Sequence, residues 1–423
     1  MVTLNSISGT TITLEVKVDI SGSMLEAEEK IQLALNEAGT VITGEALKRF
    51  DTDGSAIMTG PIKWSTKGAL PRIYQTPYGQ TEIKRHVYQT GKGGKTFCPL
   101  EQDARIIVSA TPRFAKMVSN KIANNAITTV QVDLEENHGR HCSRSLITGI
   151  IDVVGALAQA KEESWDYEVP ALDKEIANIA IGVDGTCMFI SQDGWREAMT
   201  GTVALYDKKG ERQHTIYIGA TPEYGKATFF NRMEKEIART KKLYPKADYV
   251  GLADGAKTNW NFLEKHTTIH ILDFWHVTQY LAQVAEAVYP ESEKERTAWL
   301  DERCHNLKHN KGAADVILDE IEALSQHALS RVNQEKIDGA ITYFRNHKHQ
   351  MDYPLYQSQG LPIGSGVTEA SCKTLIKHRL CASGMKWKDH GAGIVLSLRA
   401  LVLTTKRWSQ FWNKIDQFGC SFA

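Results

Sequence analysis

The pattern of apolar and polar positions begins with a small β-element. Apolar and polar residues alternate over residues 2–20, which predicts a β-hairpin. Apolar residues then recur near helical spacing, so we expect a helix that Ser23 caps and that extends through Ala38. Residues 61–98 indicate short basic strands that are broken by Pro71 and by further prolines and glycines.

A helical pattern follows over residues 111–163, with an interruption at Gly139 and a possible helix cap at Ser143. The stretch 127–160 therefore predicts a helix, a tight turn and a second helix. This is the layout of a helix-turn-helix, whose second helix enters the DNA major groove by its N-terminal residues. A helical hairpin without DNA binding has the same pattern and stays open. Three polar residues would start the second helix: Arg144, Ser145 and Thr148.

Beyond a predicted linker at 165–178, apolar runs alternate with amphipathic segments. The order is three strands, then a helix, a strand, a helix, a strand and a helix. The five strands fall within residues 179–190, 202–206, 215–220, 249–253 and 268–274. This order is typical of an RNase H-like fold, a mixed sheet with helices on both faces. The expected fold class is α/β, with a five-stranded RNase H-like catalytic core and a helical insertion. An N-terminal α/β and helix-turn-helix region would bind DNA.

These patterns predict six consecutive segments. They are an N-terminal hairpin with helices (1–60), a basic β-ribbon-like segment (61–110), the helix-turn-helix region (111–163), the first part of the core (177–289), a charged helical insertion (290–350) and a completion of the core with the catalytic helix and C-terminal helices (351–423).

Charge is distributed unevenly along a chain whose formal net charge is zero. Residues 61–125 carry eleven basic and three acidic side chains, and residues 361–423 carry nine and three. A polyanion responds to such local charge, because salt screens charges beyond about 8–10 Å. The seven cysteines are scattered without a C-x-x-C pair, which is typical of reduced thiols. With no membrane-length apolar run and no signal-peptide pattern, we expect a cytoplasmic, nucleoid-associated protein.

Three acidic residues are the candidates for chemistry. Asp184 lies within the first, otherwise apolar strand, where a carboxylate is costly unless it is paired or bound to metal. Asp254 ends the fourth strand, which neighbours the first in the expected topology. Glu369 lies one turn into the last helix, with Ser365 as its expected cap. Nearby glycines leave room for a close approach to the backbone: Gly182, Gly185 and Gly255.

Two carboxylates from strands and one from a helix suit hard divalent cations. We expect two Mg²⁺ ions, with Mn²⁺ able to substitute, because such ions prefer oxygen ligands. Paired ions stabilise the attacking and leaving oxygens of phosphoryl transfer. Lys373 and Lys377 follow Glu369 at helical spacing and could hold DNA phosphates. Taken singly, each aspartate could instead be a turn former, and Glu369 a charge on a helix face.

A second acidic motif ends the fifth strand. Asp273 and His276 could supply a ligand in place of Asp254, or form a hydrogen-bonded pair behind the metal ligands.

Five blocks in order resemble the DDE transposases of bacterial insertion sequences. They are residues 181–186 (IGVDGT), 196–202 (REAMTGT), 251–256 (GLADGA), 272–276 (LDFWH) and 362–370 (PIGSGVTEA). The chain is most similar to the Kra-type family, which is related to Mutator-like transposases. The resemblance implies a catalytic, metal-binding triad of Asp184, Asp254 and Glu369. It also implies an aspartate-x-x-histidine motif at Asp273 and His276, and an insertion domain at 290–350. Related families carry a zinc ribbon near 61–98, where only Cys98 remains here.

The expected function is therefore that of a DNA transposase. It would bind terminal inverted repeats in double-stranded DNA and hydrolyse a phosphodiester at each element end. The freed 3′-OH would then attack target DNA. A homodimer or larger assembly is expected, because two element ends must be joined to one target. An RNase H-like structure-specific nuclease and a catalytically inactive DNA-binding regulator remain as alternatives.

Overall fold

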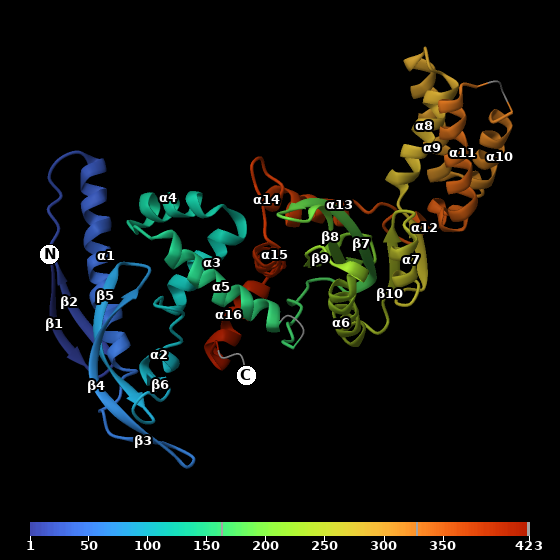
Figure 1. Ribbon diagram of the computed structural model, residues 1–423. Helices are drawn as coiled ribbons and strands as arrows, with labels where there is room; N and C mark the ends of the chain where they lie inside the picture. The colour runs from blue at the N-terminus through green and yellow to red at the C-terminus, as the bar shows by residue number, and fades with distance from the viewer. Residues whose placement is uncertain (162–163, 327–328, 421–423) are drawn as a thin grey trace. The chain divides into compact units, whose positions relative to one another are not determined.

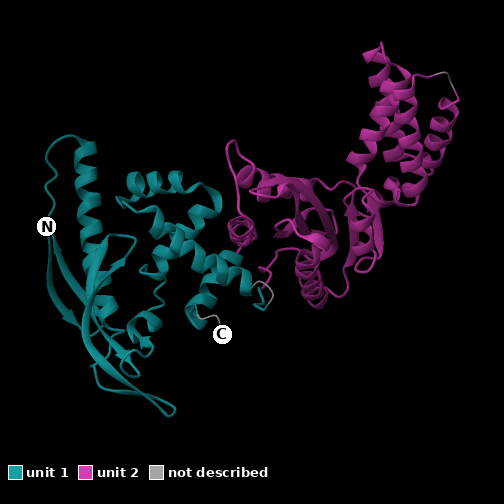
Figure 2. Cartoon of the chain, viewed as in Figure 1, with its two compact units in different colours: residues 1–167, 407–423 teal, residues 168–406 magenta. Residues whose placement is uncertain are grey.

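The computed structural model describes residues 1–161, 164–326 and 329–420, and these form two compact units. Unit 1 comprises residues 1–167 and 407–423, and unit 2 comprises residues 168–406 (Figure 2). The expected end of the helix-turn-helix region at residue 163, two positions of the expected insertion and the last three residues lie outside the described ranges. Each unit is considered by itself below.

Unit 1 begins with a hairpin of β1 (Val2–Ser8) and β2 (Thr11–Val16), followed by α1 (Met24–Lys48). Both predictions are confirmed, although the helix continues well past Ala38. Ser23 caps α1, because its hydroxyl accepts the Glu26 N–H at 3.2 Å while its own N–H donates to the Glu26 carboxylate at 2.8 Å. This reciprocal pair is a capping box, which fixes where the helix starts.

A four-stranded antiparallel sheet follows, in the order β3 (Ile57–Thr59), β4 (Ile62–Gln75), β5 (Gln80–Gln89) and β6 (Thr96–Phe97). The expectation that Pro71 breaks a strand is wrong, since Pro71 lies within β4 opposite Lys84 of β5. β3 pairs with β4 only as far as Trp64. Beside Pro71 one edge of β4 thus has no partner strand among the described residues, and such an edge tolerates a residue without an N–H.

Four helices follow the sheet: α2 (Pro99–Asp103), α3 (Pro112–Asn124), α4 (Ile127–His138) and α5 (Arg144–Lys161). Gly139 ends α4 in the left-handed region with φ of 60°, which glycine adopts without strain. The Ser143 hydroxyl accepts the Leu146 N–H at 3.3 Å at the start of α5. The helix, tight turn and helix expected within 127–160 are therefore confirmed.

The last helix, α16 (Arg407–Phe418), belongs to unit 1, although the sequence pattern grouped it with the catalytic core. Phe411 packs on Trp165 with ring centroids 5.7 Å apart, and the Arg407 guanidinium lies over Tyr167. Trp165 and Tyr167, in the expected linker, are therefore buried against α16. These contacts join segments far apart in the sequence, so no local pattern predicts them.

Unit 2 is built on a mixed five-stranded sheet (Figure 1). Its strands are β7 (Ile176–Ile190), β8 (Gly194–Asp207), β9 (Arg212–Ala220), β10 (Asp248–Ala253) and β11 (Ile269–Leu272). The order across the sheet is β11-β10-β7-β8-β9. The first three strands pair antiparallel, and β10 pairs parallel with both β7 and β11. The α/β class, the mixed sheet and the neighbouring of first and fourth strands are confirmed.

Helices cover both faces of this sheet, as the register of β8 shows. The helices packed around the sheet are α6 (Ala227–Leu243), α7 (Lys257–Leu263), α13 (Gly366–Ser371) and α15 (Asp389–Leu403). Gly201 of β8 faces Met233 of α6, whereas the next residue, Thr202, bonds to Thr368 of α13. Successive strand residues point to opposite faces, so α6 and α13 lie on opposite sides. Between α13 and α15 come a π-helical turn (Cys372–Lys377) and the short α14 (His378–Leu380).

The helices between β11 and α13 form a bundle. Figure 1 shows α8 (Phe274–Val288), α9 (Glu293–His309), α10 (Ala313–Leu324) and α11 (Arg331–His347) side by side. The short α12 (Tyr353–Ser358) leads back to the sheet. Leu281 of α8 and Phe344 of α11 belong to the same hydrophobic core as the sheet. Among the described residues, no helix is both long and apolar enough to cross a membrane.

Candidate metal centre

Asp273 is the most deeply held acid of unit 2. It is fully buried where β11 ends, and it caps α8 by accepting the Trp275 N–H at 2.9 Å. Its other oxygen lies 3.0 Å from His276 Nδ1 and accepts a hydrogen bond from the Ser365 hydroxyl. Burial alone would raise the pKa of Asp273, but these hydrogen bonds outweigh it and lower the pKa. The carboxylate is thus held in its charged form.

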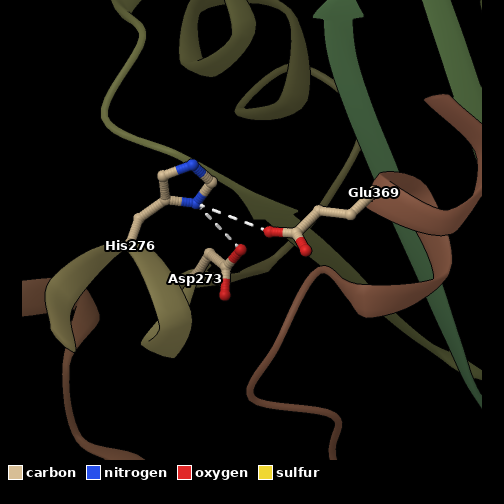
Figure 3. A group of neighbouring side chains, drawn as sticks. All are labelled: Asp273, His276 and Glu369. Carbon is tan, nitrogen blue, oxygen red and sulfur yellow. Dashed lines mark hydrogen bonds and ion pairs between the residues drawn. The ribbon is translucent and has the colours of Figure 1, made fainter. Parts of the chain in front are cut away.

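His276 and Glu369 complete a group with Asp273 (Figure 3). His276 lies one turn into α8, and its Nδ1 is 3.9 Å from Glu369 Oε1. Ligand atoms of all three residues lie within 4.8 Å of one another. The hydrogen bond with Asp273 raises the pKa of His276, whereas burial and the nearby Asp273 charge raise the pKa of Glu369. Negative charge is concentrated here.

Glu369 is positioned by direct packing of α13 on the sheet. The Thr368 hydroxyl lies 2.7 Å from that of Thr202, and the Ser371 hydroxyl lies 2.8 Å from that of Thr200. Gly182 of β7 makes this approach possible, since a Cβ there would overlap the Thr368 hydroxyl. The room expected at this glycine is therefore occupied by α13.

Ser365 occupies the N-cap position of this helix, as expected. Its side chain nevertheless makes no capping hydrogen bond, because its hydroxyl donates to Asp273 instead. Ser365 Oγ is also 3.4 Å from Glu369 Oε1. Ser365 therefore links the end of β11 to the start of α13. It contacts both Asp273 and Glu369, two of the three residues that could hold a metal ion.

Asp184 lies on β7 at the same cavity as Glu369 and His276. One oxygen accepts the Gly185 N–H at 2.7 Å, and the other lies 3.1 Å from Cys372 Sγ. Burial raises the pKa of Asp184, and the charge of Asp254 adds to this rise. No signal in the sequence marked Cys372, because its contact with Asp184 spans most of unit 2.

The cavity has a volume of about 700 Å³ and an uneven charge. Asp184 and Glu369 contribute carboxylates to its lining. Lys373, Lys377 and His378, which follow Glu369 in the chain, contribute amino and imidazole groups. The exposed Trp275 also lines it. The π-helical turn begins at Cys372, so the predicted regular helical face is wrong in detail, yet both lysines reach the cavity.

Asp254 stands apart from the three-residue group. It follows β10, where its side chain accepts the Ala256 N–H at 3.1 Å and lies 3.4 Å from Asn259 Nδ2. Its charge contributes to the raised pKa of both Asp184 and His276, so it lies within electrostatic reach of the site. Asp184 and Asp254 are thus near the candidate metal-binding group, but that group itself consists of Asp273, His276 and Glu369.

The donor atoms of this group fit a divalent cation. Two carboxylates supply hard oxygen ligands, and one imidazole supplies nitrogen, which Mn²⁺ accepts more readily than Mg²⁺ does. The sequence placed Asp273 and His276 as an alternative to Asp254. Their close pairing, at three-residue spacing after a strand, is the signal that identified them.

Three of the five candidate DNA contacts lie in unit 1. Arg144, Ser145 and Thr148 are all exposed in the first turns of α5, while Ile147 and Ile150 on its other face are buried. They are therefore accessible to a ligand. No protein-family model matches the chain, and no curated protein matches it.

Proposed function

We propose that the chain is a DDE-type DNA transposase of the Kra-type insertion-sequence family. The observation that carries this proposal is the convergence of Asp273, His276 and Glu369. His276 and Glu369 line a cavity that Asp184 and two lysines also line. The strand order, with three antiparallel strands followed by two parallel ones, supports an RNase H-like core. Half-buried carboxylates beside lysines are suited to phosphodiester chemistry.

The residues of the cavity have separate tasks in this proposal. Glu369, Asp184 and either Asp254 or Asp273 would hold divalent cations, with His276 as a further ligand or as the partner that orients Asp273. A bound Mg²⁺ or Mn²⁺ would activate water and stabilise the leaving oxygen of an in-line displacement. Lys373 and Lys377 would hold phosphates beside the cleaved bond, a contact that carries no sequence information.

Unit 1 would recognise the terminal inverted repeats. The exposed start of α5 presents Arg144, Ser145 and Thr148 for base contacts, as second helices of helix-turn-helix motifs do. The basic window 61–125 would supply a sequence-independent attraction that weakens as salt rises.

The test is incubation of labelled duplexes from both element ends with Mg²⁺ or Mn²⁺, with products mapped to the nucleotide. Glu369→Gln should lower cleavage by at least about 100-fold, because it removes a charge that a cation needs, while DNA binding stays unchanged. Glu291→Gln is the matched control, since Glu291 is exposed and does not line the cavity. Absence of metal-dependent cleavage by the unaltered chain would refute the proposed enzymatic activity. The alternative of a catalytically inactive DNA-binding regulator would then remain.

The same assay separates a transposase from a nuclease. A transposase joins the freed 3′-OH to target DNA, so supercoiled plasmid should yield products longer than the donor duplex. Cleavage without any joined product would identify a structure-specific nuclease instead.

A further inference from the structure

Cys372 holds a buried thiol against the carboxylate of Asp184. Cys372 is only 5% exposed, and its Sγ lies 3.1 Å from Asp184 Oδ2. An ionised carboxylate can only accept hydrogen bonds, so the thiol is the donor of this contact. The tasks proposed above for the residues of the cavity leave this thiol without one, although it lines the same cavity.

The two oxygens of Asp184 are held by different parts of the chain. Oδ1 accepts the N–H of the neighbouring Gly185 at 2.7 Å, whereas the Cys372 donor lies 188 residues away in the sequence. The terminal torsion of an aspartate has broad preferences, so a single local donor leaves the plane of the carboxylate free to turn. A second donor on the other oxygen fixes that plane. Because each carboxylate oxygen can accept about two bonds, both oxygens keep capacity for a cation.

A widened helical turn holds the thiol in place. Cys372 opens the π-helical turn that follows α13, and such turns are frequent at functional sites. Leu375 within the turn is fully buried in the same apolar cluster as Met188 of β7. The Leu375 carbonyl accepts the Arg399 Nε–H at 2.9 Å. The sulfur therefore lies on a segment that is fixed by its own packing, so its contact can orient the Asp184 carboxylate rather than follow it.

A space-filling role for Cys372 is the alternative, since buried free cysteines commonly behave as small apolar residues. The two roles predict different effects of two substitutions. Valine fills the space of the thiol but has no donor, whereas serine keeps a donor. If Cys372 only fills space, valine should serve at least as well as serine. If Cys372 is a donor, serine should serve and valine should not.

We propose that the Cys372 thiol is a positioning group that orients the Asp184 carboxylate for cation binding. The inference rests on the proposed function in one respect, namely that Asp184 is a metal ligand. Loss of a hydrogen-bonded partner behind a metal ligand typically lowers metal affinity by about 10–100-fold. Because the thiol acts through Asp184, it sets the cation affinity of the site and takes no part in the chemistry.

Mn²⁺ binding by the full chain without DNA tests the role of the thiol. The paramagnetic resonance signal of unbound Mn²⁺ gives a dissociation constant without any reaction. Cys372→Val should raise this constant at least about tenfold, and Cys372→Ser should keep it within about threefold of the unaltered value. Cys142→Val is the matched control, because Cys142 is a similarly buried thiol, 3% exposed, in unit 1. This control should bind Mn²⁺ as the unaltered chain does.

Coupling to Asp184 is the second measurement. In an Asp184→Asn background, Cys372→Val should change the Mn²⁺ affinity little, because the thiol acts through the carboxylate that has been removed. Equal losses with and without Asp184→Asn would show that valine disturbs the site by packing, and would overturn the proposal. Urea unfolding in EDTA checks that each variant folds. If Cys372→Val does not fold, Cys372→Ala also lacks a donor and takes its place, with the same expected loss.

The positioning role and the proposed function fail on different results. Equal Mn²⁺ affinities of Cys372→Val and Cys372→Ser would overturn the positioning role, whatever the chain does to DNA. Absence of Mn²⁺ binding by the unaltered chain would overturn it as well. Thiol-dependent Mn²⁺ binding without DNA cleavage would instead refute the proposed enzymatic activity and leave the positioning role intact.

Discussion

At the scale of the residue, Asp273 and Asp254 differ in how the fold holds them. Asp273 is fully buried and accepts hydrogen bonds from the Trp275 N–H, the Ser365 hydroxyl and His276. Asp254 caps a local turn and has weaker partners. The two carboxylates should therefore respond differently to the same substitution.

Asp273→Asn should destabilise the protein as well as abolish cleavage. An amide has one acceptor oxygen where the carboxylate has two, so a buried donor loses its partner at a cost of about 1–3 kcal/mol. Asp254→Asn should abolish cleavage with little loss of stability. Urea unfolding in EDTA and cleavage assays check both variants. Full cleavage by Asp254→Asn would assign the second-acid role to Asp273.

The His276–Asp273 pair gives a pH-dependent stability. The pKa of His276 is raised, so its contribution to the free energy of unfolding is fully present below the ordinary value of 6.5. That contribution is lost as pH rises through the raised pKa. The lowered pKa of Asp273 means that its contribution is present above the ordinary value of 3.8 and is lost as pH falls. The pair should thus stabilise the metal-free protein most between these two ordinary values.

His276→Gln should test that window. In EDTA, the variant should be less stable than the unaltered protein by about 1–2 kcal/mol near pH 6, because a charged hydrogen bond is lost. The difference should shrink as pH rises through the raised pKa of His276. Urea midpoints measured across pH check this, and a difference that does not shrink as pH rises would contradict it.

At the scale of the element, the contact between α13 and β7 sets the position of Glu369. Gly182→Ala should push α13 from the sheet, since the added methyl overlaps the Thr368 hydroxyl. Cleavage should fall at least about tenfold, because small displacements of catalytic groups are costly.

Gly339→Ala provides a control with the same chemical change. Gly339 lies within α11, where an added Cβ meets nothing within 4 Å. Alanine favours a helix over glycine by roughly 1 kcal/mol, so this variant should keep activity and gain stability. Equal activity of the two alanine variants would show that α13 tolerates displacement.

Elements with local signals could be predicted from the sequence. The cap at Ser23, the turn at Gly139 and the succession of strands along unit 2 all follow from neighbouring residues. The hydrogen bond of Ser365 could not be predicted, because its hydroxyl has a choice between the helix start and Asp273, 92 residues away. The sequence indicated both Asp254 and Asp273 as candidates for the second acid of the triad. Their different burial depends on how β10 and β11 end.

The insertion also has a role that its sequence did not show. Tyr343 of α11 packs against the backbone beside Asp254, where a Cβ on Gly255 would lie 2.6 Å from its ring. Tyr343 is also stacked on Tyr280 of α8, with ring centroids 3.9 Å apart. The insertion thus packs on both the turn that holds Asp254 and the helix that holds His276.

At the scale of the whole molecule, unit 1 is discontinuous in sequence. Phe411 and Ile415 of α16 are fully buried, and the Arg105 side chain donates to the Asp416 carbonyl at 2.8 Å. Unit 2 is inserted in the sequence between the two parts of unit 1. Stability of unit 1 should therefore depend on residues that follow unit 2.

A chain ending at Lys406 should have a destabilised unit 1. Loss of one buried phenylalanine side chain costs about 3–5 kcal/mol, and α16 contributes several buried residues. Hydrogen exchange should accelerate in α3 and α5, while β7 keeps its protection. A chain ending at Phe418 is the control and should exchange normally. Unchanged protection in the shorter chain would show that α16 is dispensable.

The interleaving of the two units also sets an order on synthesis. A ribosome completes residues 168–406 before it reaches residues 407–420, so unit 1 receives its last helix after unit 2 has been translated. A chain that stops anywhere within unit 2 leaves unit 1 without that helix. Under the proposed function, prematurely terminated products would be poor competitors for the element ends. Only chains translated through both units would occupy them.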